Sequence, residues 1–279
     1  MGLAVVLVLT GAAPPTPSIL PAGIPSGQEQ RLARIDVAAL PEGSRRAVAT
    51  SLARWRRLQP LPAGRYLLIN IPAFEINLYD GQVRLGRWRA IVGKPGTPTP
   101  TFNWQATGVI LNPGWDVPKS IVAESVGALM ARRPAEAARR GYVRDGDRIS
   151  QKPGPENQLG QMKLDFANAL GIGIHDTPAR GLFARDKRAL SHGCIRVDDP
   201  LGFAATLLGG DVTREALAAM LPGGQTQRLA FAAPIPVIIG YFTAEVDDTG
   251  VVLIHNDIYR LDRQEPAAAS QDAESECAV

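Results

Sequence analysis

Ser191-His192-Gly193-Cys194-Ile195-Arg196 is the stretch that decides how this chain is interpreted. Together with His175 upstream, it holds one of only two cysteines and two of only three histidines in 279 residues. A nucleophile and two possible proton acceptors therefore fall close together, beside a glycine and a fixed cation. Because the thiolate is the reactive form of cysteine and a neighbouring imidazole can generate it, the pattern predicts a cysteine enzyme that transfers acyl groups.

The order of His175, Ser191-His192-Gly193-Cys194 and Arg196 resembles the active-site signature of the L,D-transpeptidases, the YkuD-type catalytic domain of bacterial cell-wall enzymes. The resemblance is to the branch of large Gram-negative members and extends from about Trp55 to Asp262. It implies a mainly β fold with helices, namely a β-sandwich catalytic domain with a helical capping insertion. It includes further motifs: Arg65-Tyr66-Leu67-Leu68-Ile69-Asn70-Ile71-Pro72, Val92-Gly93-Lys94-Pro95, Thr99-Pro100, Asn112-Pro113-Gly114-Trp115, Pro155-Glu156-Asn157 and Tyr241-Phe242-Thr243-Ala244.

Composition places the chain among globular proteins. Hydrophobic residues make up 45% and charged residues 20%, and 279 residues are enough for one large domain or two small ones. The net charge of +3 with a pI of about 9.0 gives weak support for an anionic partner such as a cell-wall polymer. No basic cluster indicates nucleic acid binding. Cys194 is expected to be free and not paired with Cys277, which lies in a polar tail.

The chain begins with an apolar run from Leu3 to Leu9, followed by small residues and then Pro14-Pro15. This order resembles the core and end of a secretory signal, although no Lys or Arg precedes the run. The run is too short to span a bilayer as a helix. Since the substrate of the resembling family lies outside the cytoplasmic membrane, we predict export to the periplasm.

The sequence is expected to divide into four parts. Residues 1–26 form a signal-like segment and linker, 27–59 an N-terminal helical extension, 60–265 the catalytic domain and 266–279 a polar tail. Within the catalytic domain, residues 119–157 change to helical composition. Long connections of this kind commonly form lids or binding loops, and the resemblance implies that this insertion caps the substrate groove.

Runs of β-forming residues between turn signals predict the strands. We expect strands at 65–71, 75–79, 82–93, 104–112, 170–174, 193–197, 237–245 and 250–255. Helices are expected at 121–133, 134–140, 200–208 and 211–221, the third capped by Asp199. Many strands with a few local helices predict a mainly β sandwich decorated by helices.

Cys194 is the predicted nucleophile, and His175 is the predicted general base and later the general acid. The resemblance implies that a backbone carbonyl just after the histidine orients its ring, and here that carbonyl belongs to Asp176. The Asp176 carboxylate is the alternative. Adjacent residues on a strand point to opposite faces, which argues against the carboxylate.

The other residues of the signature have predicted supporting roles. On an extended segment His192 would share a face with Cys194, so it could be the base itself. The resemblance implies instead that it supports the oxyanion region and the substrate. The N–H groups of Gly193 and Cys194 are candidate donors to a tetrahedral oxyanion. Ser191 is expected to orient either His192 or the substrate.

Substrate binding is assigned to Arg196, Ser191, Asp176, Trp115 and Tyr142. Arg196 is expected to bind a carboxylate through two parallel hydrogen bonds or, alternatively, to pair with Asp198 or Asp199. Trp115 and Tyr142 are candidates for lining the groove, with packing as the alternative for both.

A metal site is the competing interpretation of His175, His192 and Cys194, since catalytic zinc uses three protein ligands and a water. No Cys-x-x-Cys pair or His-Glu-x-x-His helix accompanies them, and Cys194 as a ligand would no longer be a nucleophile. We therefore predict no metal and no cofactor. His255 follows an apolar strand without a motif partner and is predicted to be structural or at the surface.

The resemblance implies the reaction and its substrates. Cys194 would attack the carbonyl between diaminopimelate and the terminal D-Ala of a peptidoglycan tetrapeptide stem, and D-Ala would leave. An amine of a neighbouring stem would then resolve the thioester into a 3→3 cross-link. With water as the acceptor the chain would be an L,D-carboxypeptidase or amidase, and with a protein amine an anchoring enzyme. A non-catalytic wall-binding module is a further alternative.

Large members of the family carry an N-terminal scaffold and often a peptidoglycan-binding module. Fewer than about sixty residues precede the catalytic domain here, which is too few for either. We therefore expect a periplasmic cell-wall partner to supply docking to the wall.

Overall fold

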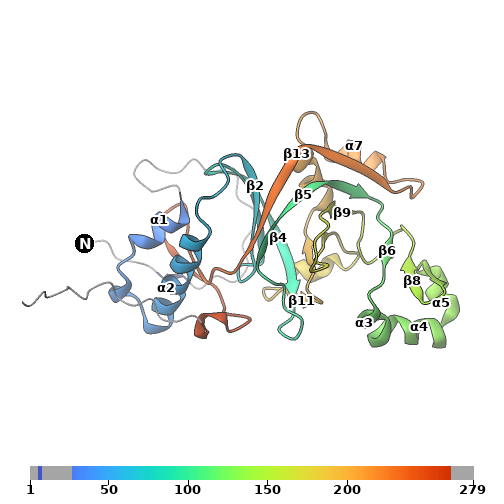
Figure 1. Ribbon diagram of the computed structural model, residues 1–279, viewed down its shortest axis with the longest axis horizontal. Helices are drawn as coiled ribbons and strands as arrows, with labels where there is room; N and C mark the ends of the chain where they lie inside the picture. Colours follow the sequence, from blue (N-terminus) through green and yellow to red (C-terminus); the bar gives the residue numbers. More distant parts are fainter. Residues whose placement is uncertain (1–5, 8–26, 265–279) are drawn as a thin grey trace, which may run out of the picture.

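The computed structural model describes residues 6–7 and 27–264; the rest of the signal-like segment, the linker, the polar tail and Cys277 lie outside the described residues. A nine-stranded sheet forms the centre of the molecule (Figure 1). Its strands are β2 (Arg65–Asn70), β3 (Glu75–Asp80), β4 (Val83–Gly93), β5 (Phe102–Leu111), β9 (Met162–Asp165), β10 (Ile174–His175), β11 (Ala189–Ser191), β12 (Ile195–Val197) and β13 (Gln227–Gly240). They lie in the order β11-β4-β12-β10-β9-β5-β13-β2-β3.

Strand β4 closes this sheet on itself. Its first part, from Val83 to Arg89, pairs antiparallel with β3. Ala90 and Ile91 pair with β12, and the last two residues pair with β11. The predicted mainly β fold is confirmed. The nine strands form one sheet that closes on itself, and not the two separate sheets of the predicted sandwich.

Strand β2 buries side chains on both of its faces. Because successive residues of a strand point to opposite faces, Leu67 and Ile69 enter the interior of the closed sheet, whereas Tyr66 and Leu68 enter a second core on the outside. Strand β13, which pairs parallel with β2, does the same. Burial on both faces explains why β2 is a nearly continuous apolar run and does not alternate with polar residues.

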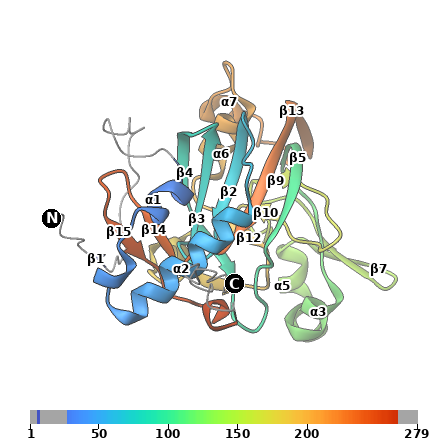
Figure 2. The ribbon, with the colours of Figure 1, turned by 60° about the vertical axis from the view of Figure 1, so that its left-hand side comes forward.

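The outer core is covered by the N-terminal helices α1 (Gln28–Ala33) and α2 (Glu42–Arg57), joined by the 3₁₀ turn η1 (Val37–Ala39). Figure 2 shows both helices beside a small sheet of β1 (Val6–Leu7), β14 (Ala244–Val246) and β15 (Val252–Ile254). Trp55 of α2 stacks on Phe242 with ring centroids 4.1 Å apart. Strand β1, from the apolar run predicted as a signal, pairs parallel with β15.

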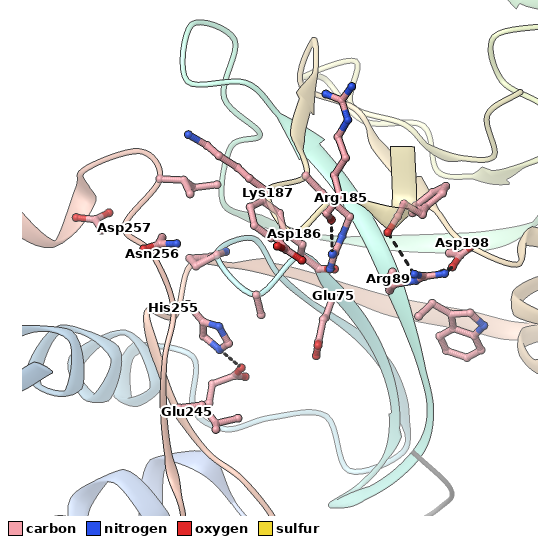
Figure 3. A pocket seen from close by; sticks show the side chains of 18 of the residues that line it. Glu75, Arg89, Arg185, Asp186, Lys187, Asp198, Glu245, His255, Asn256 and Asp257 are labelled. Atoms are coloured by element: carbon pink, nitrogen blue, oxygen red, sulfur yellow. Dashed lines mark hydrogen bonds and ion pairs between the residues drawn. The ribbon is translucent and has the colours of Figure 1, made fainter. Parts of the chain in front are cut away.

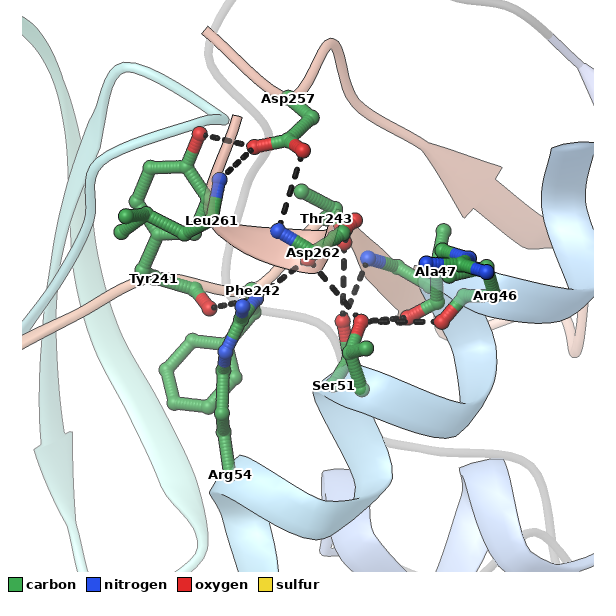
Figure 4. Close-up of polar contacts among 12 residues, drawn as sticks. Arg46, Ala47, Ser51, Arg54, Tyr241, Phe242, Thr243, Asp257, Leu261 and Asp262 are labelled. Carbon is green, nitrogen blue, oxygen red and sulfur yellow. Dashed lines mark hydrogen bonds and ion pairs between the residues drawn. The ribbon is translucent and has the colours of Figure 1, made fainter. Parts of the chain in front are cut away.

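A buried polar network ties α2 to the C-terminal segment (Figure 4). Arg54 forms an ion pair of 2.7 Å with Asp262 and donates to the carbonyl of Tyr241 at 3.0 Å. The hydroxyl groups of Thr50 and Thr243 donate to the same carboxylate at 3.0 and 2.6 Å. The Asp262 charge is therefore paired and hydrogen-bonded, as burial of a carboxylate requires.

The predicted insertion is a compact unit at the opposite end of the molecule from α1 and α2 (Figure 1). Its elements are β6 (Trp115–Asp116), α3 (Lys119–Ile121), the π-helical turn η2 (Val122–Val126), α4 (Gly127–Arg132), α5 (Pro134–Arg139), β7 (Tyr142–Asp145) and β8 (Arg148–Gln151). It begins before residue 119 and includes a three-stranded sheet, so it is not purely helical. Its own core contains Val117, Val126, Ala137, Tyr142 and Ile149.

Four predicted strands are wrong in their bounds. The strand expected at 193–197 is only Ile195–Val197, and the one expected at 250–255 is only Val252–Ile254. The run 237–245 is divided, because β13 ends at Gly240 and β14 belongs to another sheet. The side chain of Asn70 exchanges two hydrogen bonds with the backbone of Phe242, at 2.9 and 3.0 Å, where the chain leaves the large sheet. In the run 170–174 only Ile174 is in a strand, because Asn168 holds residues 168–172 in a turn through bonds to both backbone groups of Ile172.

The helix expected at 200–208 is present as α6 (Pro200–Leu208), and the Asp199 carboxylate accepts from the Gly202 N–H as predicted. The helix expected at 211–221 is shorter, as α7 (Arg214–Ala219). Two 3₁₀ turns, η3 (Arg180–Ala184) and η4 (Leu261–Arg263), complete the fold. Within residues 6–7 and 27–264, no helix has the length and apolar character needed to cross a membrane.

Candidate active site

Residues 191–194 form a tight turn between β11 and β12, named here the catalytic loop. Gly193 has a φ of +112°, a conformation that glycine adopts without strain. The Ser191 hydroxyl donates to the Cys194 carbonyl at 2.5 Å and accepts from the Gly193 N–H at 3.1 Å. The Gly193 N–H, one of the two predicted oxyanion donors, is thus engaged within the loop in this structure. The Cys194 N–H donates no hydrogen bond within the described residues and stays the candidate donor.

The connection between β4 and β5 clamps the catalytic loop from one side. Thr99 donates from Oγ1 to the Gly193 carbonyl at 2.7 Å and accepts from the Gly93 N–H at 2.9 Å. The Lys94 N–H donates to the Ser191 carbonyl at 2.9 Å. A side chain at Gly93 would collide with the backbone of this connection. The motifs around Gly93 and Thr99 therefore hold the catalytic loop in place, a role that was not predicted from the sequence.

The Cys194 thiol is half-buried, and its Sγ accepts from the Gly173 N–H at 3.2 Å. Burial raises the pKa of the thiol, while the Gly173 N–H and the positive charge of Arg196 act in the opposite direction. The raised pKa means that the thiol is protonated at neutral pH. Its activation therefore requires a base.

His175 lies on β10, which pairs parallel with β12 so that His175 is opposite Arg196. Its Nδ1 is 2.5 Å from the Asp176 carbonyl oxygen. Because a carbonyl only accepts, Nδ1 carries the proton and Nε2 presents a lone pair. Burial, and then the charge of Arg196, lower the pKa of His175 to about 4, which the Asp176 carbonyl partly offsets. The ring is neutral at pH 7 and is thus able to accept a proton.

The Asp176 carboxylate is turned away from this ring, as strand alternation predicts. It accepts from the backbone N–H of Gln161 at 2.7 Å and from Arg180 at 2.8 Å. Burial raises the pKa of Asp176, against these hydrogen bonds and the charge of Arg180. The orienting group of His175 is therefore the carbonyl and not the carboxylate.

Gly173 brings the thiol and the imidazole together. A Cβ at this position would lie 3.6 Å from both the Cys194 Sγ and the His175 Cδ2. The absence of a side chain therefore leaves the space between the two reactive groups open. Gly173 was not predicted as a site residue. The sequence signal that could have identified it is the pair of glycines, Gly171 and Gly173, just before His175.

Arg196 does not form the ion pair considered as its alternative role. Asp198 pairs with Arg89 at 2.5 Å, and Asp199 pairs with Arg214 at 2.8 Å. The Nε of Arg196 is buried and has no hydrogen-bond partner within the described residues. Burial lowers the pKa of this guanidinium, whereas Cys194 raises it. A half-buried cation without a counter-charge favours a site for an anion.

His192 faces the insertion, whereas the Cys194 Sγ faces Gly173. The His192 Nε2 lies 2.9 Å from the Glu124 carboxylate and 3.3 Å from the Lys94 Nζ. The expectation of one shared face for His192 and Cys194 is wrong, because residues 192–194 form a turn and strand alternation does not apply. Glu124, 68 positions away in the sequence, was missed because no sequence signal links it to the loop.

The three residues considered as zinc ligands do not converge. His175 faces the Asp176 carbonyl, whereas His192 faces Glu124. In the part of the chain that the structure describes, no three His, Cys, Asp or Glu side chains are grouped to hold a metal ion. Among the same residues Cys194 forms no disulfide.

The family model of the L,D-transpeptidase catalytic domain matches residues 64–239. The chain belongs to the L,D-transpeptidase family. A Haemophilus influenzae protein named "Putative L,D-transpeptidase" is 30% identical over 223 residues, which are 71% of this chain and 45% of that protein. The chain thus spans about half the length of the curated relative that it matches.

Solved structures of L,D-transpeptidases also match. One from Mycobacterium smegmatis has a TM-score of 0.35 and 14% identity, covering 64% of this chain and 59% of that one. The catalytic domain of the E. faecium enzyme has a TM-score of 0.34 and 17% identity, covering 64% of this chain and 98% of that domain. These TM-scores are low, so nothing is concluded from the solved structures. The family assignment rests on the match to the family model.

Trp115 and Tyr142, the predicted groove residues, pack in the insertion of this L,D-transpeptidase domain. Tyr142 is 8% exposed within the core of the insertion, where burial raises the pKa of its hydroxyl. Trp115 is partly buried and packs against the same core. Both therefore have the packing role that was the alternative.

A cavity of about 1560 Å³ opens elsewhere in the L,D-transpeptidase domain, between the 183–188 segment and the 253–260 segment (Figure 3). Neither Cys194 nor His175 lines it. His255 lies 2.9 Å from Glu245, in agreement with its predicted structural role. The ion pairs on the cavity walls are Glu75–Arg87, Arg89–Asp198 and Glu245–His255. Because neither reactive residue lines the cavity, it is no candidate for the reaction.

Proposed function

We propose that this chain is a peptidoglycan L,D-transpeptidase that forms 3→3 cross-links through a thioester on Cys194. One arrangement carries the proposal. A protonated thiol and a neutral His175 adjoin the same open space at Gly173, and the half-buried Arg196 guanidinium beside them has no ion-pair partner within the described residues. These groups supply a nucleophile, a base and a binding group for a stem carboxylate.

In the first half-reaction, the His175 Nε2 takes the proton of the Cys194 thiol as the sulfur attacks the carbonyl between diaminopimelate and D-Ala. The Cys194 N–H is the group that would face the developing oxyanion. The C–N bond then breaks, the imidazolium protonates the leaving D-Ala amine, and a thioester remains. His175 is neutral again at the end of this half-reaction.

In the second half-reaction, an amine of a neighbouring stem attacks the thioester carbonyl. The new C–N bond forms as the C–S bond breaks, and the amine proton passes through His175 to the Cys194 sulfur. We place the reaction in the periplasm, because peptidoglycan stems lie outside the cytoplasmic membrane. Docking to the wall by a periplasmic partner is part of the same proposal.

Intact-protein mass spectrometry tests the proposal directly. Incubation with a disaccharide-tetrapeptide is expected to give a Cys194 adduct that lacks D-Ala and is converted to a cross-linked dimer only when a second stem is added. The Cys194→Ala variant should give neither product. An adduct that is only hydrolysed would make the chain a carboxypeptidase or amidase, and wild-type dimer formation by Cys194→Ala would refute the thioester route.

The role of Arg196 can be tested separately from folding. The Arg196→Met variant should lose donor acylation while its melting temperature stays the same or rises, because an apolar side chain replaces a half-buried charge whose Nε has no hydrogen-bond partner within the described residues. Arg196→Lys keeps the charge but not the bidentate geometry and should have intermediate acylation. Wild-type acylation by Arg196→Met would remove the carboxylate-binding role.

A further inference from the structure

Glu124 is the carboxylate by which the insertion reaches the catalytic loop. Its Oε2 lies 2.9 Å from the His192 Nε2, and its Oε1 lies 3.7 Å from the Lys94 Nζ. Within the described residues, no other carboxylate hydrogen-bonds to a residue from Ser191 to Arg196. The Glu124 side chain is 52% exposed and that of His192 39% exposed, so both are open to solvent and to a ligand.

A rare backbone feature places Glu124 there. Residues 122–126 form a π-helical turn, and the N–H of Gly127 donates to the carbonyl of Val122. A Cβ at Gly127 would lie 2.8 Å from that carbonyl oxygen, closer than real Cβ atoms approach. Single π turns inside helices are frequent at functional sites. The glycine therefore permits the turn that directs Glu124 toward His192.

The proton balance of the second half-reaction leaves one proton without an acceptor. An alkyl amine is an ammonium ion at neutral pH, since its pKa is near that of lysine, about 10.4. It must lose one proton before it can attack and a second after the C–N bond has formed. His175 carries only the second proton, which it passes to the Cys194 sulfur. The first proton must leave before the attack, at the place where the ammonium is held near the thioester.

We propose that Glu124 and His192 form the acceptor site: Glu124 binds the ammonium of the incoming stem, His192 donates from Nε2 to the same carboxylate and holds it in place, and the ammonium loses its first proton to solvent at this exposed pair. The inference rests on the proposed function. His192 and Cys194 are two residues apart, so their Cα atoms lie within about 7 Å. Lys94 already places an ammonium 3.7 Å from Glu124, which indicates that this carboxylate accommodates such a group.

The Glu124→Gln variant separates the two half-reactions. Thioester formation with the tetrapeptide donor should stay within about twofold of wild type, because Glu124 faces His192 and not the thiol. Aminolysis by a stem amine should fall about tenfold through a higher KM for the acceptor, since a charge-assisted hydrogen bond is lost. The melting temperature should not change, because Glu124 is exposed.

A neutral nucleophile provides the decisive control. Hydroxylamine is uncharged at pH 7, so it should resolve the thioester of Glu124→Gln as fast as that of wild type. The matched charge control is Asp147→Asn, an exposed residue of the same insertion in the turn between β7 and β8, which should behave as wild type. Lys94→Gln removes the competing ammonium and should lower the acceptor KM.

The outcomes are distinguishable. A stem-amine rate of Glu124→Gln equal to that of wild type would overturn the acceptor site. An equal loss with hydroxylamine and with the stem amine would also overturn it, since the effect would then not depend on charge. If the wild-type protein forms no thioester with the donor, the proposed function fails first, before the acceptor step is reached.

Discussion

The two regions added to the closed sheet approach the catalytic loop in opposite ways. Helix α2, at one end of the molecule, is joined to the rest by a buried ion pair between Arg54 and Asp262, in which both side chains are at most 10% exposed. The insertion, at the other end, reaches the loop through Glu124, whose side chain is 52% exposed. The difference indicates that one region fixes the site and the other adjusts it.

Hydrogen bonds continue from the buried network to the catalytic loop. The Asp262 N–H donates to Asp257, which accepts from the Tyr241 hydroxyl at 2.7 Å. That hydroxyl accepts from the N–H of Tyr259, and the Tyr259 hydroxyl donates to the carbonyl of Gly93 at 2.6 Å. Gly93 and its neighbour Thr99 hold the catalytic loop. The clamp behind the loop is thus connected to α2 by groups whose polar atoms are satisfied internally.

Asp262→Ala should have the largest effect, because it leaves the buried Arg54 without its carboxylate. Breaking a buried ion pair costs about 3 to 5 kcal/mol, so the free energy of unfolding in urea should fall by that amount. The exposed pair of Asp116 and Arg148 is the matched control, with side chains 76% and 77% exposed. Equal decreases in the free energy of unfolding for Asp262→Ala and Asp116→Ala would mean that burial does not make the first ion pair stronger than the second.

Ile149→Ala should destabilise the insertion without unfolding the closed sheet. Ile149 is 3% exposed in the separate core of the insertion, and such truncations cost about 2 to 5 kcal/mol. Hydrogen exchange should quicken in 115–151 and stay unchanged in β2 and β13. Val143→Ala, on an exposed position of β7, is the control. Faster exchange throughout the sheet would show that the two cores unfold together.

Thr99→Val tests the clamp itself. The valine leaves the Gly193 carbonyl and the Gly93 N–H without their partner, at a cost of about 1 to 3 kcal/mol for each buried group. A displaced Cys194 should slow acylation by about a hundredfold. Thr97→Val is the control, because the Ser191 carbonyl that it contacts also accepts from the Lys94 N–H. Similar acylation rates for both variants would remove Thr99 from the clamp.

The smallest effect is expected from a moderate change in pH. Burial lowers the pKa of His175 to about 4, so the imidazole keeps its lone pair between pH 7 and pH 5. Acylation should be nearly constant over that range and fall only as the pH decreases through about 4, because protonation removes the base. The pH profile of single-turnover acylation measures this. A fall that begins near pH 6.5 would mean that the ring is solvated.

Much of this arrangement was predictable from the residues alone. The spacing of His175 and Cys194 indicates cysteine chemistry, and strand alternation correctly excludes the Asp176 carboxylate as the orienting group. Predictions based on alternation failed where the backbone is not extended. His192 and Cys194 lie in a turn at Gly193, and the run after Gly240 leaves the sheet because Asn70 bonds to Phe242.

The sequence by itself determined the candidate nucleophile, the candidate base and the mainly β class, because these depend on residue type and on the periodicity of the side chains along each strand. Only the tertiary structure decided which charges are paired. Arg196 has two acidic residues just after it in sequence, yet Arg89 and Arg214 take both, and Glu124 reaches His192 from 68 positions away. Pairing of charges depends on distances across the closed sheet, and these are set by packing between segments that the linear order does not bring together.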